Sequence, residues 1–200
     1  MLQIMIKIFI KNRPYGFIYS EKLPAQGFTE RRIPVIPNGV AVTGDYSDIA
    51  DNHCAAVCAM NMMLILRKFG IGSLIQNREE QERRELFKDI HRIVGNGPVI
   101  FLKPKLNKIF RSIGAGLKTV PTTDFKDIEK CMIENRPVAL LVNAGITQWH
   151  WITIVGIRKY MDGSIYFNIL DGWNKRTDRY LKYIGRETYI RALMPVNEKE

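Results

Sequence analysis

The feature of the sequence that most limits its fold is a change of hydrophobic period at Pro137. Between residue 54 and this proline the segments are typical of helices, and after it β-branched and aromatic residues gather in short runs that are typical of strands. Helices followed by an antiparallel sheet predict an α+β fold, which we assign to one domain over residues 1–200. The predicted helices cover residues 54–69, 77–94, 103–113 and 123–135, and the predicted strands are "PVALLVN", "HWITIVGIRKY", "SIYFNILDGW" and "TYIRALMPV".

Capping residues and turns mark the ends of these elements. Asp51 or Asn52 is the expected N-cap of the helix that begins near residue 54, and Thr122 or Thr123 is the expected start of the last helix. Between the second and third strands, the residues 161–163 ("MDG") predict a hairpin. The alternating isoleucines of residues 4–10 predict a further strand at the beginning of the chain.

Composition and charge narrow the class of protein. A hydrophobic content of 46% and a charged content of 25% are globular values. The apolar run of residues 4–10 is far shorter than the roughly 20 residues that span a bilayer, and no cleavage site follows it. We therefore expect no membrane span and a cytoplasmic location, with export as the open alternative. The net charge of +10 is interpreted as a solvated basic surface, because no nucleic-acid-binding motif accompanies it.

The stretch "DNHCAAVCAMNMMLIL" (residues 51–66) holds two of the three cysteines. A structural zinc site would need a second cluster of ligands, which the sequence does not offer, so we expect no metal. Cys58 lies within the apolar run and Cys131 in the middle of a later helix, so both are interpreted as core residues. Cys54 differs because it opens a helix. The N–H groups and the dipole at that position favour a thiolate and lower the cysteine pKa from about 8.5.

A nucleophilic cysteine needs a base, and the chain offers only three histidines. His91 lies in a charged helix, and His53 is next to the cysteine but points in a different direction from it. His150 opens a strongly apolar strand between two tryptophans. Asp171 ends the following strand, and antiparallel pairing brings the start of one strand beside the end of the next. The sequence therefore predicts that His150 and Asp171 are neighbours.

This order of residues resembles the papain-like cysteine peptidases, and most of all the bacteriocin-processing peptidases that cut double-glycine leaders, with their stand-alone relatives. The motifs are "HCAAVCAMNMML", "HWITIVG" and "DGW", and the resemblance spans about residues 45–175. It implies a papain-like fold with the nucleophile helix packed on an antiparallel sheet. It also implies a catalytic triad of Cys54, His150 and Asp171, a peptide or protein substrate, and no cofactor.

The sequence departs from this family pattern at the oxyanion hole. The family has a glutamine six residues before the nucleophile, where this chain has Asp48. An ionised carboxylate cannot donate a hydrogen bond, so Asn52 is the alternative donor. Three functions remain open from the sequence: a cysteine peptidase, an acyltransferase or amidase with the same triad, and a catalytically impaired module that binds a peptide or protein partner. The oligomeric state is not predicted.

Overall fold

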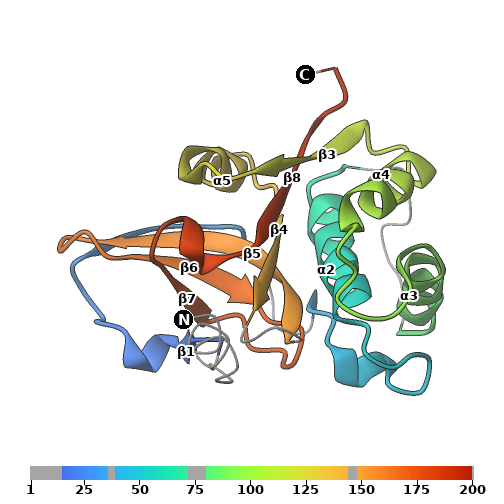
Figure 1. Ribbon diagram of the computed structural model, residues 1–200, viewed down its shortest axis with the longest axis horizontal. Coiled ribbons are helices and arrows are strands. Elements are labelled where there is room, and N and C mark those ends of the chain that lie inside the picture. The colour runs from blue at the N-terminus through green and yellow to red at the C-terminus, as the bar shows by residue number, and fades with distance from the viewer. Residues whose placement is uncertain (1–14, 36–38, 72–79, 144–147, 200) are drawn as a thin grey trace, which may run out of the picture.

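The computed structural model describes residues 15–35, 39–71, 80–143 and 148–199. Figure 1 shows the helices between residues 54 and 112 together at one end of the molecule, whereas the helix of residues 125–133 lies apart from them, beside the strands. The helices are α2 (Cys54–Lys68), α3 (Glu80–Val94), α4 (Leu102–Ser112) and α5 (Phe125–Ile133). The strands are β1 (Phe17–Tyr19), β2 (Phe28–Arg32), β3 (Leu117–Thr122), β4 (Val138–Asn143), β5 (Trp149–Tyr160), β6 (Ile165–Leu170), β7 (Arg179–Tyr183) and β8 (Arg191–Asn197).

The strands form one antiparallel eight-stranded sheet, in which seven strands follow the order β1-β7-β6-β5-β4-β8-β3 and the eighth, β2, pairs with β5 beside this path. The long strand β5 pairs with β4 through its first half and with β2 through its second half. The predicted α+β class is confirmed, as are the four predicted helices, the four predicted strands and the hairpin between β5 and β6. Strands β1, β2, β3 and β7 were not predicted, and the strand predicted over residues 4–10 lies outside the described residues.

Alternate side chains of the central strands face two different hydrophobic cores. In β4, Ala139 and Leu141 join the core that contains α2, α3 and α4. Leu140 and Val142 join the core that contains α5. Both faces of the sheet centre are therefore covered, which explains why "PVALLVN" is apolar at nearly every position.

Helix α2 is buried on almost all sides, because it lies between the sheet on one side and α3 on the other. This matches its sequence, which is apolar around the whole helix and not along a single stripe. Helix α3 holds the loop before α2 through Phe87, whose ring stacks on Tyr46 with centroids 3.8 Å apart. Helix α2 is thus packed on the antiparallel sheet, as predicted.

The helix ends differ from the sequence prediction. His53, and not Asp51 or Asn52, is the N-cap of α2, and it makes no side-chain capping bond. Asn52 has a positive φ of 51°, a conformation that asparagine tolerates better than most residues. Helix α5 is capped by Asp124, whose carboxylate accepts from the Lys126 N–H, and not by Thr122 or Thr123. The predicted caps were wrong because α2 begins at Cys54, one residue later than Asn52 as N-cap requires, and because Asp124 competes with the two threonines at the start of α5.

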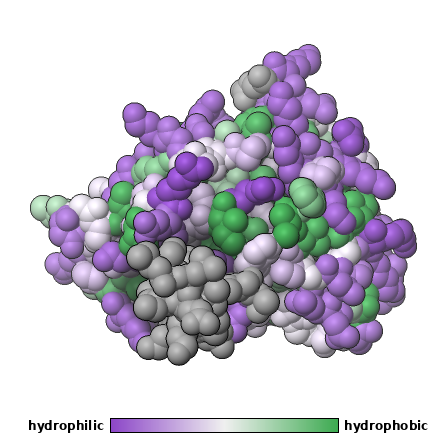
Figure 2. All heavy atoms as spheres, viewed as in Figure 1, coloured by the Kyte–Doolittle hydropathy of each residue, from purple (hydrophilic) through white to green (hydrophobic). Residues whose placement is uncertain are grey.

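The surface agrees with the charge of the sequence. On the face shown in Figure 2, hydrophilic side chains cover most of the area and hydrophobic ones form smaller patches between them. Among the described residues, no helix is long and apolar enough to cross a membrane.

Candidate active site

Cys54 is the first residue of α2, as the sequence predicts. Only 6% of its surface is exposed. Burial raises the pKa of its thiol, although main-chain hydrogen bonds from Trp151 and Ala55 act in the opposite direction. The expectation that the helix start lowers this pKa is therefore not met, because the loss of hydration outweighs the nearby donors.

His150 lies at the start of β5 and is 3% exposed. Its Nε2 lies 2.6 Å from the main-chain carbonyl oxygen of Asp171. A carbonyl can only accept a hydrogen bond, so Nε2 carries the proton and Nδ1 keeps the lone pair that a base needs. Burial lowers the pKa of His150 to about 4, more than the Asp171 carbonyl raises it. The imidazole is therefore neutral at pH 7.

Asp171 is next to His150, but its carboxylate points elsewhere. Oδ1 accepts from the main-chain N–H groups of Trp173 and Asn174, at 2.8 and 3.2 Å. Oδ2 accepts from the Asn174 amide at 2.9 Å and from the Arg179 guanidinium. The resemblance implies a carboxylate that orients the histidine, whereas here the contact is made by the main-chain oxygen.

Gly172 makes the tight corner after β6 possible. Its φ is +75°, which favours glycine, and a Cβ built on it would lie 3.3 Å from Val57 Cγ1 of α2. The Gly172 carbonyl also accepts from the Thr43 N–H at 2.8 Å. The absence of a side chain therefore lets the corner lie directly against α2.

Cys54 and His150 line one cleft of about 370 Å³, together with Tyr15, Thr43, Asn52, His53, Gln148, Trp149 and Trp173. No hydrogen bond joins the Cys54 thiol to His150 in the part of the chain that the structure describes. The reason is the alternation along β5. The Trp151 side chain faces the core that contains α2, whereas Ile152 faces the core on the other side of the sheet. Since side chains alternate along a strand, His150 is on the same face as Ile152. His150 reaches the cleft because it is at the end of the strand.

The two predicted oxyanion-hole residues lie in different places. Asp48 does not line the cleft, and its carboxylate pairs with Arg84 of α3. That hydrogen bond lowers the pKa of Asp48, so the group is ionised and has no proton to donate. Asp48 therefore has no role as a donor at this site. Asn52 does line the cleft, and it is an exposed residue two positions before Cys54.

The other two cysteines are buried, and the other two histidines lie within hydrogen-bonding distance of polar groups. Cys58 is buried, and its thiol donates to the Ile152 carbonyl at 3.2 Å, while burial raises its pKa to about 12. Cys131 is buried on α5, as predicted, and all three cysteines are free. His53 lies 3.1 Å from the Thr43 carbonyl through Nε2. His91 Nε2 lies 2.7 Å from the Asn96 side chain on the surface.

Sequence reasoning missed the aromatic residues that cover His150. The Trp173 ring stacks on the imidazole with centroids 4.1 Å apart and an angle of 12°. Tyr15 contacts both rings, with centroids 5.6 Å from His150 and 5.5 Å from Trp173. Phe17 of β1 lies beside them and stacks on Tyr15. Trp173 stands two residues after Asp171 and was a detectable signal, but no short-range pattern indicates Tyr15, which comes from far away in the sequence.

Three of the basic residues after Asp171 form ion pairs, namely Lys175, Arg176 and Arg179. Lys175 pairs with Asp45 at 3.1 Å, and Arg176 pairs with Asp178 at 2.6 Å and with Glu21. These contacts tie the loop to neighbouring segments. They agree with the interpretation of a solvated basic surface, and not with a free patch for an acidic substrate.

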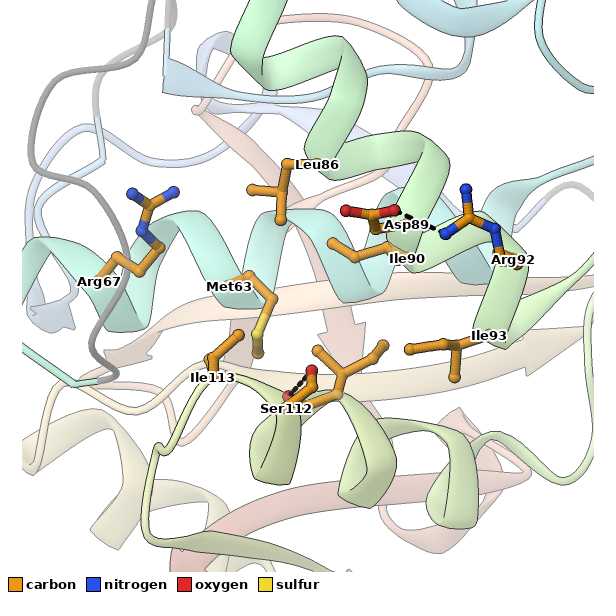
Figure 3. Close-up of a pocket in the computed structure, with 10 residues that line it drawn as sticks. Met63, Arg67, Leu86, Asp89, Ile90, Arg92, Ile93, Ser112 and Ile113 are labelled. Carbon is orange, nitrogen blue, oxygen red and sulfur yellow. Dashed lines mark hydrogen bonds and ion pairs between the residues drawn. The ribbon is translucent and has the colours of Figure 1, made fainter.

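A second cavity of about 330 Å³ lies between α2, α3 and α4. Figure 3 shows apolar side chains from these helices directed into it, with Arg67 and the Asp89–Arg92 ion pair at its border. None of its lining residues is a cysteine or a histidine. The candidate chemistry therefore belongs to the cleft that holds Cys54.

Comparison with known proteins gives structural neighbours only. No protein-family model and no curated protein matches the sequence. The structure is similar to the bromelain protease from Ananas comosus in complex with the E64 inhibitor. That comparison has a TM-score of 0.45 and 13% identity, and covers 86% of this chain and 99% of that one. A recombinant stem bromelain precursor gives a TM-score of 0.42 and 14% identity, over 98% of this chain and 87% of that one.

Proposed function

We propose that the protein is a papain-like cysteine peptidase that cleaves a peptide bond through a thioester intermediate. The observation that carries this proposal is the meeting of Cys54 and His150 in one cleft, although they are far apart in the sequence. Cys54 opens a buried helix, and His150 is held in the tautomer whose Nδ1 can accept a proton. The motif resemblance supports the finer proposal of a relative of the peptidases that process double-glycine leaders.

In the proposed reaction, His150 removes the proton of the Cys54 thiol, and the sulfur attacks the carbonyl carbon of the substrate. The imidazolium then gives its proton to the leaving amine as the carbon–nitrogen bond breaks, which leaves a thioester on Cys54. Water attacks the thioester with His150 as the base. The acid product leaves, and the thiol regains its proton. Every step uses groups of the protein, the substrate and water.

The raised pKa of Cys54 and the lowered pKa of His150 favour a neutral thiol and a neutral imidazole in the free protein, and not an ion pair. Burial disfavours both the thiolate and the imidazolium. We therefore propose that the thiolate is a minor species in the free protein, which alkylation traps slowly, and that the proton moves fully when a substrate is in place and Cys54 and His150 approach each other. Catalytic hydrogen bonds in free enzymes are often long and tighten in the substrate complex.

The decisive experiment is alkylation of the protein by iodoacetamide, with the modified residue located by mass spectrometry. We expect alkylation of Cys54 in the natural protein and its loss in Cys54→Ala. Cys131→Ala is the matched control, because it removes a buried thiol on α5, away from the cleft, and labelling of Cys54 should persist. Cleavage of a mixed peptide library should be lost in Cys54→Ala and fall at least about 1000-fold in His150→Gln. An unlabelled Cys54 would contradict the proposal.

A second candidate is a peptide-binding module without catalysis. It is favoured by the lack of a Cys54–His150 hydrogen bond in the described chain and by the position of Asp48 outside the cleft. Peptide capture with no cleavage, unchanged in Cys54→Ala, would identify it. An acyltransferase or amidase would use the same Cys54 and His150, and iodoacetamide would alkylate its Cys54 in the same way. It would be recognised by transfer of the acyl group to an added amine, or by release of ammonia from an amide.

A further inference from the structure

We propose that Arg179 is a positioning residue of this site: its guanidinium neutralises the Asp171 carboxylate, so that His150 is held by the Asp171 main-chain carbonyl alone. The proposal rests on the proposed role of His150 as the base. It assigns a task to Arg179, which no sequence motif indicates. It also changes the proposed role of Asp171. The carboxylate is no longer a charged partner of the imidazole, but accepts hydrogen bonds that hold the turn after β6 in place.

The first argument is the geometry of Asp171. Its side chain is 1% exposed, and four donors surround the two carboxylate oxygens: two main-chain N–H groups, the Asn174 amide and Arg179. A buried carboxylate needs this degree of compensation. With its oxygens occupied, the carboxylate is unavailable to His150, and the carbonyl oxygen takes its place at 2.6 Å.

The second argument is the way in which Arg179 is held. The residue lies on β7, and its side chain is 17% exposed. Its guanidinium lies over two rings of β1, with centroids 4.8 Å away at Tyr19 and 5.5 Å at Phe17. Contacts of this kind fix the plane of an arginine. Arg179 thus connects the edge strand β1 to the corner that supports His150.

The third argument is electrostatic, and it concerns the charged and titratable groups that the described residues place around His150. Cys54 and His53 face the cleft from α2 and its N-cap, and Tyr15 from the segment before β1. Asp171 and Arg179 act from the side of β6 and β7. Burial is the main cause of the low His150 pKa, whereas the Asp171 charge raises it and the Arg179 charge lowers it. The last two contributions oppose each other, as expected for a neutralised pair.

The experiment is a cycle of variants read by NMR titration of the His150 ring, assigned with His150→Gln. In Arg179→Gln the Asp171 carboxylate keeps three donors but loses its countercharge. An uncompensated anion favours the imidazolium, so the pKa of His150 should rise by about 1. Arg179→Lys should keep the natural value, and the double variant Asp171→Asn, Arg179→Gln should return close to it. Arg176→Gln is the matched control, since Arg176 pairs with Glu21 and Asp178, and it should not move the pKa.

Ring-nitrogen chemical shifts give a second readout, because they identify the tautomer of His150. In Asp171→Asn the Nε2–H tautomer should persist, since the main-chain carbonyl remains. Alkylation of Cys54 in that variant should slow by less than about tenfold. A triad that depends on the carboxylate would instead lose about 10⁴-fold, as in the exchange of aspartate for asparagine in serine proteases.

Three results would overturn the proposal: an unchanged His150 pKa in Arg179→Gln, a raised pKa that the double variant does not restore, or a change of tautomer in Asp171→Asn. The NMR readouts need no catalysis. If they behave as expected while Cys54 is neither alkylated nor able to cleave peptides, the proposed function fails and the placement of His150 stands.

Discussion

At the scale of single residues, Asn52 is the part of the site with the clearest test. It lines the cleft next to Cys54, and it does not cap α2, so its side chain is free of that structural role. We predict that Asn52→Gly lowers acyl transfer by about 10- to 1000-fold, because a side-chain donor to the oxyanion is lost. Glycine is the correct replacement, since it accepts the positive φ of 51° that would strain alanine. Rates of peptide cleavage give the measurement.

The stability of the same variant supplies its control. Asn52→Gly should unfold within about 0.5–1 kcal/mol of the natural protein, because no cap is removed and glycine only adds freedom to the unfolded chain. A rate equal to that of the natural protein would exclude Asn52 as the oxyanion donor. Asp48→Ala tests the other candidate, and it should change the rate little, since Asp48 is on the surface with Arg84.

At the scale of elements, α3 holds the loop that leads to Cys54. Its Phe87 is fully buried, stacks on Tyr46 and meets the His53 ring edge-on at 5.3 Å. We predict that Phe87→Ala costs about 3–5 kcal/mol of unfolding free energy in urea titrations. Cys54 should also react faster with iodoacetamide, because the loop that buries it is loosened. Phe101→Ala is the control, at 71% exposure, and should cost less than about 1 kcal/mol. Equal costs for the two variants would contradict this role.

The elements also show what could be predicted from the sequence and what could not. The four helices and strands β4, β5, β6 and β8 were predicted because each contains six or more residues with a periodic or continuous set of apolar positions, whereas the shorter β7 was missed. Strands β1 and β2 were missed because they are short and half-exposed, and their pairing with β7 and β5 joins segments far apart in the sequence. The proximity of His150 and Asp171 followed from hairpin geometry. Which atom of Asp171 meets His150 depended on Arg179 and Asn174, and local sequence does not encode that competition.

At the scale of the whole molecule, the order of strands brings segments from near both ends of the described chain into one sheet. The last strand, β8, lies between β4 and β3, and β1 near the beginning pairs with β7. The cleft depends on this arrangement, since Cys54 comes from the helical part, His150 from β5, and Tyr15 from the segment before β1. The complete cleft therefore requires the helical part, β5 and the segment before β1 to be in place together.

We therefore propose that residues 1–200 fold as one domain, and we predict a single cooperative unfolding transition. Trp149, Trp151 and Trp173 lie at or beside the cleft, so tryptophan fluorescence reports on the site, whereas far-UV circular dichroism reports on the helices. The two signals should give the same urea midpoint, because the helices and the cleft share one sheet and two connected cores. The midpoint should move equally for both signals in Phe87→Ala. A fluorescence change that precedes the loss of helix would mean that α2, α3 and α4 form a separate folding unit.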